Sequence, residues 1–288
     1  FQALDAASFF QGGNPNTQAT TSAVLERDAQ AYAYSYWVRF AWDRLEVEAE
    51  YAGILGSIGS ISIAGDYGVT DKKITINQHA GAVKVIYGVG ETGLKLRLLV
   101  VAASGDRAAG WGIRPLSSTT NIPGQWDGTQ APEGDDSINN FRIDPDFIVD
   151  MILWRELVGM VTDAVVVRPG VSYFVGAGLS AHLDVVYSRS LFAESTPSGG
   201  FSDLVDVNSG ADRADLGAPS KDLGVEFDFK LAYDAPDGLH LWLQYGLLVP
   251  LSGLDRQVVV SDGGAPASTI SNEGDPIGRL DARVAQTF

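Results

Sequence analysis

Residues 31–55, AYAYSYWVRFAWDRLEVEAEYAGIL, alternate between two kinds of side chain. Successive side chains of a β-strand point to opposite faces, so residues of one parity share a face. From Tyr32 to Trp42 the even positions are aromatic or aliphatic, and from Leu45 to Tyr51 the odd positions are. Glutamates fill the opposite face between Leu45 and Tyr51. The pattern predicts two strands joined by a tight turn at Asp43-Arg44, each with an apolar face and a polar face.

The composition restricts the classes of protein that remain. The chain has 288 residues and no cysteine, which excludes disulfides, thiolate metal sites and cysteine nucleophiles. Its formal net charge of −16 argues against a nucleic acid as partner. No apolar run approaches the roughly 20 residues that a membrane helix requires. Strands of a membrane barrel alternate and leave no such run, so a membrane stays open. No motif indicates a cofactor.

The same alternation recurs along the whole chain. It predicts nine strands, at 31–42, 45–56, 76–87, 94–104, 164–174, 179–190, 222–234, 239–249 and 277–288. The links between them alternate in length: 43–44, 88–93, 175–178 and 235–238 are short, and 57–75, 105–163, 191–221 and 250–276 are long. Short periplasmic turns alternating with long external loops are typical of outer-membrane barrels. We therefore expect an all-β, transmembrane, antiparallel up-and-down β-barrel in a bacterial outer membrane.

One apolar stretch does not alternate. In DPDFIVDMILWRELVG, residues 144–159, apolar side chains occupy both parities. Asp144 is a plausible N-cap, Pro145 suits the first helical position, and Gly159 suits the C-terminal stop. These features predict one short helix inside a long external loop, with a fully buried strand as the alternative. Its apolar residues favour a position inside the barrel mouth or at an interface.

Aromatic residues end every strand that runs toward the short turns. They are Trp42, Tyr87, Tyr173, Tyr233 and Phe288. Membrane barrels carry such girdles where lipid meets water. We expect these residues to mark the periplasmic membrane interface, with outer-membrane lipid as the partner of the apolar face. A looser set, Tyr32, Tyr51, Tyr187 and Tyr245, is the candidate for the outer girdle.

The direction of the first strand bears on the domain organisation. It runs toward the periplasm, which places residues 1–29 on the external side and residues 30–288 in the barrel. Bacterial single-chain barrels usually have an even number of strands. The sequence therefore predicts at least ten strands, with one upstream of Phe1 or poorly patterned within 1–29.

Several segments resemble one known family. NNFRIDPDFIVDMILWRELVGMVTDA, VYSRSLFAESTP, LQYGLLVPLSGLD and AYAYSYWVRFAWDRLEVEAEYAGILGSIG are similar to segments of an uncharacterised family of predicted outer-membrane barrels of myxobacteria. The terminal Phe288, with Leu280, Ala282 and Val284 on its face, resembles the C-terminal strand recognised during barrel assembly, although Gln286 departs from that pattern. The resemblance runs from about residue 25 onward and implies a barrel, with no established activity and no catalytic residues.

The polar faces of the strands would line a lumen. They hold residues of both charges: Arg39, Glu46, Glu48, Glu50, Lys84, Lys95, Arg97, Arg168, His182, Asp184, Glu226, Asp228, Lys230 and His240. An open lumen of this kind predicts a porin-like passive channel for ions or small solutes. A lumen packed by ion pairs predicts a structural or interaction barrel that presents acidic loops to partners. Both hypotheses remain open on the sequence.

Other chemistry is less well supported. His182 and Asp184 share a strand face, which makes a lumenal hydrolase the third hypothesis, but no partner motif accompanies them and a hydrogen-bonded pair is the simpler interpretation. Acidic loops at 134–136 and 272–275 make divalent cations further candidate partners, although their spacing matches no calcium motif. We expect neither an enzyme nor a metal centre. A soluble sandwich or lipocalin-like barrel is the alternative fold, and it would bury the Tyr32–Trp42 face.

Overall fold

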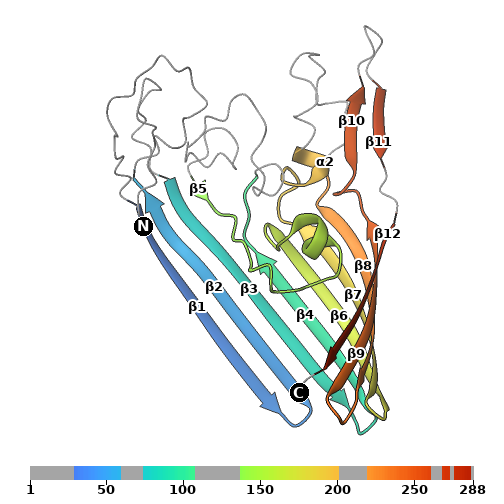
Figure 1. Ribbon diagram of the computed structural model, residues 1–288. Coiled ribbons are helices and arrows are strands. Elements are labelled where there is room, and N and C mark those ends of the chain that lie inside the picture. The colour runs from blue at the N-terminus through green and yellow to red at the C-terminus, as the bar shows by residue number, and fades with distance from the viewer. Residues whose placement is uncertain are drawn as a thin grey trace, which may run out of the picture.

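The computed structural model describes residues 29–59, 74–107, 137–200, 219–260, 268–272 and 276–286. In these residues nine long antiparallel strands form one curved sheet, ordered as in the sequence (Figure 1). The strands are β1 Ala29–Trp42, β2 Leu45–Ile58, β3 Ile74–Val89, β4 Leu94–Ala103, β6 Ala164–Gly176, β7 Leu179–Ser190, β8 Asp222–Asp234, β9 Leu239–Pro250 and β12 Ile277–Gln286. The predicted all-β up-and-down fold is confirmed. The sheet is open in the described part, with β1 and β12 at its edges.

Smaller elements belong to the long links. β5, Ser137–Ile138, pairs in parallel with β3, and a separate hairpin joins β10, Arg256–Val260, to β11, Ser268–Asn272. The helical elements of the described chain are the short α2, Pro197–Gly200, and a π-helical turn, Leu153–Val158. Neither has the length and apolar character needed to cross a bilayer. The tenth strand, predicted either upstream of Phe1 or within 1–29, lies outside the described residues and stays a prediction.

The short links form tight turns at one end of the sheet (Figure 1). Trp42 pairs directly with Leu45, so Asp43 and Arg44 are the whole turn, and Asp43 takes a positive φ of 50°. Between β6 and β7, Ala177 and Gly178 have φ of 49° and 83°. Positive φ at both central residues matches the twist of a two-residue hairpin. All four predicted short turns are present.

The pairing register separates the two faces of the sheet as the alternation predicts. Phe40 lies opposite Val47, whereas the neighbouring Arg39 lies opposite Glu48. The apolar face, called the outer face below, is exposed along the sheet, and Trp42 at its turn end is 71% exposed. No described residue forms a layer over it. The described residues therefore do not bury the Tyr32–Trp42 face, as the alternative sandwich or lipocalin-like barrel would.

The predicted aromatic row lies near the turn end of the outer face. Trp42, Tyr87, Tyr173 and Tyr233 each sit at or close to the last residue of their strand and are exposed. Phe288 lies outside the described residues. Midway along β2, Tyr51 Oη lies 2.8 Å from His79 Nδ1, on the same face. That these rows mark a membrane interface stays a prediction.

Residues 144–159, called the inward segment below, lie on the other face, the inner face, over β6 to β8 (Figure 1). The predicted helix is wrong in extent. Only Leu153–Val158 is helical, as a π-turn, and it ends at Gly159 with φ of 97° as expected. Asp144 caps a separate turn, in which its carbonyl accepts from the Phe147 N–H at 2.9 Å. Residues 149–154 are buried as an irregular chain, which is why apolar residues of both parities occur there, whereas Phe147, Ile148 and Leu157 are exposed.

The hydrophobic core lies between the inward segment and the inner face. Its largest buried side chains from the segment are Leu153 and Trp154, with 1% and 2% exposure. They pack with small or branched residues of the sheet, including Val101, Val166 and Val186. Burying such side chains is worth about 1.5–3 kcal/mol each, which holds the segment against the sheet.

Gly170 on β6 makes room for a buried charge. A Cβ added there would lie 1.8 Å from Asp184 Oδ1, so Gly170→Ala must displace the Asp184 carboxylate. We expect a loss of about 3 kcal/mol in the free energy of unfolding, measured by urea denaturation, because a buried charge pair is broken. Gly88→Ala is the control, since its nearest contact would be an ordinary 3.5 Å. Equal effects of the two changes would contradict this account.

Candidate functional site

The fourteen side chains predicted to line a lumen all fall on the inner face. The strand registers place them in adjoining rows from β1 to β9. They divide into a cluster on β1 to β3 and a second, more buried set on β4 to β9. That the inner face encloses a lumen stays a prediction.

The cluster on β1 to β3 is a small network of ion pairs. Arg39 Nη2 donates to Glu46 Oε1 at 3.0 Å, and Lys84 Nζ donates to Glu48 Oε2 at 2.9 Å. Arg39 Nε also lies 3.5 Å from Glu48. The cationic side chains are about half exposed, at 51% for Arg39 and 48% for Lys84. Exposed pairs of this kind contribute little to stability, so the main effect of the cluster is on the charge of the inner face.

The more buried set centres on one row that crosses six strands. Its members, from β4 to β12, are Arg97, Gly170, Asp184, Asp228, Gly246 and Arg279. Arg97 reaches across Gly170, and its Nη2 donates to Asp184 Oδ1 at 2.9 Å. Arg168 Nη2 donates to Asp184 Oδ2 at 2.7 Å. The carboxylate of Asp184, which is 5% exposed, is therefore held by two guanidinium groups.

Asp228 lies directly opposite Asp184 and has no such partner. It is 5% exposed, and neither carboxylate oxygen has a hydrogen-bond partner among the described residues. Arg279 stands in the corresponding place at the other end of the row, beyond Gly246. Its Nη1 instead donates to the Met151 carbonyl at 3.1 Å and pairs with Glu156, both in the inward segment. Asp228 therefore lies beside the carboxyls of Asp184 and Glu226 with no described cation bonded to it.

Glu226, two residues before Asp228, holds the inward segment in place. Its Oε1 accepts from the backbone N–H of Met151 at 2.8 Å and of Ile152 at 2.9 Å. Its Oε2 accepts from the Leu153 N–H at 3.2 Å. Met151 and Ile152 precede the π-turn and Leu153 is its first residue, so these amides have no carbonyl partner within the turn. A carboxylate that accepts several backbone N–H groups is a strong anchor in a buried place.

Asp150 caps the same turn from within the segment. Its carboxylate accepts from the Trp154 N–H at 3.0 Å and the Arg155 N–H at 3.2 Å. Burial, with the nearby Glu226 carboxylate, raises the pKa of Asp150 to about 7.

Two further hydrogen bonds join the inward segment to the sheet. Arg168 Nη1 donates to the Val149 carbonyl, and Trp154 Nε1 donates to Ser188 Oγ at 3.0 Å.

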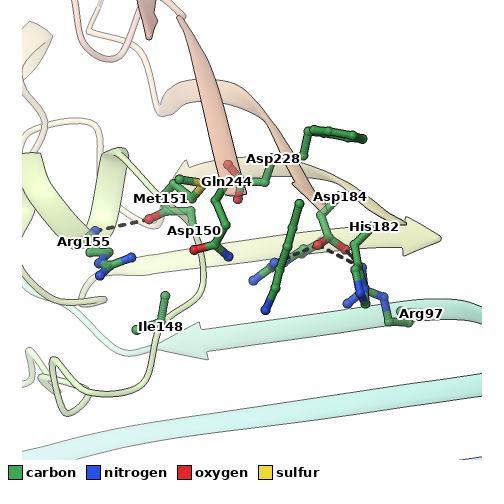
Figure 2. Close-up of a pocket in the computed structure, with 12 residues that line it drawn as sticks. Arg97, Ile148, Asp150, Met151, Arg155, His182, Asp184, Asp228 and Gln244 are labelled. Carbon is green, nitrogen blue, oxygen red and sulfur yellow. Dashed lines mark hydrogen bonds and ion pairs between the residues drawn. The ribbon is translucent and has the colours of Figure 1, made fainter. Parts of the chain in front are cut away.

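A pocket of about 290 Å³ remains between the segment and the sheet. Figure 2 shows its two sides: Ile148, Asp150, Met151 and Arg155 of the segment on one, and Arg97, His182 and Asp184 on the other, with Asp228 and Gln244 between them. Lys230 also lines it, and its ammonium lies 5.7 Å from the centre of the Trp242 ring. The pocket thus brings together groups of both charges in a largely buried place.

The predicted pairing of His182 with Asp184 differs in the structure. Both line the pocket, but Asp184 is taken by the two arginines and His182 Nε2 lies 3.2 Å from Ser180 Oγ. No hydrogen bond joins the two residues. His240, another inner-face residue, instead bonds Asp234 at 2.7 Å.

Metal binding finds no support in the described part of the chain, where no group of three or more His, Asp or Glu side chains is placed to hold an ion. The acidic loop 134–136 and residues 273–275 lie outside the described residues. A divalent cation there stays a prediction.

Sequence reasoning missed Asp150, Arg279 and the two glycines of the row. Asp150 was assigned only to a helix, whereas it caps the turn that fills the inner face. Arg279 shares the parity of the inner face on its strand, so the alternation itself could have identified it.

No family model matches the chain, and no curated protein matches it.

Asp163 anchors the end of the loop that contains the inward segment. It is fully buried, has a φ of 48°, and accepts through Oδ2 from Ser190 Oγ at 2.8 Å and from Ser195 Oγ. Its Oδ1 has no partner among the described residues. Burial raises the pKa of Asp163 to about 7. The charged form is therefore poorly accommodated in the folded chain.

We predict that Asp163→Asn removes a pH dependence of stability. The unfolded carboxyl ionises near 3.8 and the folded one near 7, so the folded state holds the extra proton between these values. The contribution of the Asp163 carboxyl to the free energy of unfolding is greatest below pH 4, decreases as the pH rises toward 7, and is constant above that pH. The free energy of unfolding of the variant minus that of the wild type should grow across this window, by at most about 4 kcal/mol. Asparagine tolerates positive φ and accepts from the serines. A flat difference between pH 4 and 8 would contradict the prediction.

We also predict that Glu226→Ala loosens the inward segment. Three backbone N–H groups lose their acceptor, and an unsatisfied buried donor costs about 1–3 kcal/mol. Hydrogen exchange at Met151, Ile152 and Leu153 should therefore accelerate at least tenfold. Glu91→Ala, in an exposed turn, serves as the control and should leave their exchange unchanged. Unaltered protection in the Glu226 variant would show that packing alone holds the segment.

Proposed function

We propose that the chain forms a bacterial outer-membrane β-barrel whose charged inner face lines a narrow passive channel, restricted by the inward segment. The observation that carries the proposal is the contrast between the two faces. The outer face exposes large apolar side chains on strand after strand, while the inner face holds the charges and the inward segment. A contiguous exposed apolar surface of this size marks a contact with lipid or with another protein.

Lipid is the partner that best fits the outer face. Aromatic side chains lie near the turn end of four of its strands, Tyr32 is exposed near the other end of β1, and Tyr34, Tyr36 and Tyr51 form a cluster midway along β1 and β2. Rings with a polar tip favour the two interfaces of a bilayer, and aliphatic residues favour the layer between. The alternation of short turns and long links follows the same orientation. The resemblance to predicted barrels of myxobacteria supports the same location.

The inner face supports a restricted passage for small polar solutes. In the Arg39–Glu46–Glu48–Lys84 cluster the two cationic side chains are about half exposed, so water reaches this part of the face. Over β6 to β8 the inward segment occupies the space instead. Charges of both signs on the wall would favour small ions and polar solutes over apolar ones.

A structural or interaction barrel is the second candidate. The observation that favours it is the core beneath the inward segment, where Trp154 and Leu153 are almost wholly buried. A lumen closed by such packing would not conduct. The third hypothesis, a hydrolase at His182 and Asp184, loses support because a general base requires an orienting partner and Asp184 is committed to arginines.

Single-channel recording in planar lipid bilayers separates the first two candidates. We predict a small conductance for the wild type and an increase of several-fold when residues 145–158 are replaced by a Gly-Ser linker of equal length, because the segment narrows the passage. Trp154→Ala, which removes the largest buried side chain of the segment, should shift the conductance in the same direction. Leu55→Ala on the outer face is the control and should leave the conductance unchanged.

The absence of conductance in wild type and variants alike, from protein that is folded and inserted, would reject the channel in favour of the structural barrel. Recovery of the protein outside the outer-membrane fraction of a Gram-negative host would reject both.

A further inference from the structure

Two buried polar groups that bond to no other described residue line the same pocket. One is the carboxyl of Asp228, whose oxygens accept no hydrogen bond from that part of the chain, and the other is Arg97 Nε, which donates none to it. In native proteins buried polar atoms are almost always bonded, so each exception calls for a cause. An acceptor and a donor left open across one cavity indicate a ligand that carries both a cationic and an anionic group.

The neighbouring cations leave Asp228 unsatisfied. The Nη2 atoms of Arg97 and Arg168 are bonded to Asp184. Arg279 is bonded to the inward segment. The Lys230 ammonium lies over the Trp242 ring, with no carboxylate within salt-bridge distance among the described residues. A cation that relieves Asp228 must therefore enter from the pocket.

The basic side of the pocket requires an anion. Arg97 Nε, the Lys230 ammonium and the Gln244 amide line the pocket and supply donors for an anion. A free carboxylate of a ligand would meet these donors while its ammonium group meets Asp228. The volume of about 290 Å³ is at the lower end of the range for ligand pockets, about 300–1,000 Å³, so the ligand is small.

We propose that this pocket binds a small zwitterion of the amino-acid type, with its ammonium group on Asp228 and its carboxylate toward Arg97 and Lys230. Because the pocket lies on the inner face beside the inward segment, the inference names the solute class of the proposed channel and rests on that function for its role. The binding itself requires no membrane and can be measured separately.

The test is isothermal titration calorimetry on the folded protein in detergent micelles. The probes are glycine, 4-aminobutyrate and 6-aminohexanoate, which separate ammonium and carboxylate by increasing lengths, with butylamine and butyrate as singly charged controls. We expect at least one zwitterion to bind at least tenfold more tightly than both controls. Butylamine has no carboxylate for Arg97, and butyrate has no ammonium group for Asp228.

Asp228→Asn is the decisive variant. It should weaken binding of that zwitterion at least tenfold without lowering the melting temperature, because asparagine keeps the side-chain volume and removes a carboxyl that lies beside those of Asp184 and Glu226. A residue retained only for structure would lower the melting temperature when changed. Glu91→Gln, in an exposed turn, is the matched control and should alter neither reading.

Three results would overturn the inference: no zwitterion binds, butylamine binds as tightly as the best zwitterion, or Asp228→Asn binds unchanged. Binding without conductance would reject the channel while leaving the site intact. Conductance without binding would reject the site alone.

Discussion

The bonds from Glu226 to three successive backbone amides are the contact on which the inner face depends. They fix the inward segment over β8, and the segment in turn supplies Leu153 and Trp154 to the core. The same placement brings Met151 and Glu156 within reach of Arg279, which leaves Asp228 without a cation. The position of Glu226 on β8 therefore determines three features: the pocket, the lack of a cation beside Asp228, and the narrowing of the space over the inner face.

Most of the sheet could be predicted from the sequence because one periodic constraint governs each strand. When one face is apolar and the other polar, a slip of one residue would invert every side chain, so pattern and register specify each other. Residues 31–55 show this most clearly, since Arg39 meets Glu48 and Phe40 meets Val47 as the parities require. The turn between them consists of two polar residues, because the register leaves no others between the two strands. The fourteen inner-face residues were identifiable on parity alone.

The inward segment could not be predicted in the same way, because its conformation is set by residues far along the chain. Asp144, Pro145 and Gly159 carry the local signals of a helix, and only the stop at Gly159 operates as one. The amides of Met151, Ile152 and Leu153 bond to Glu226, some 75 positions away for Met151. Likewise the isolation of Asp228 depends on where Arg279 turns. Such tertiary partners override local propensity.

The row across β4 to β12 reads Arg, Gly, Asp, Asp, Gly, Arg, the same from either end. Taken alone, this palindrome would let each arginine cross its glycine and satisfy the nearer aspartate. Only the Arg97 half does so, because Met151 lies against Gly246, with its Cβ 3.1 Å from where a Cβ of that glycine would be. The inward segment thus breaks a symmetry that the sheet itself encodes. The inward segment and Asp228 compete for the guanidinium group of Arg279. A ligand cation that pairs with Asp228 removes this competition and therefore favours the contact between Arg279 and the segment.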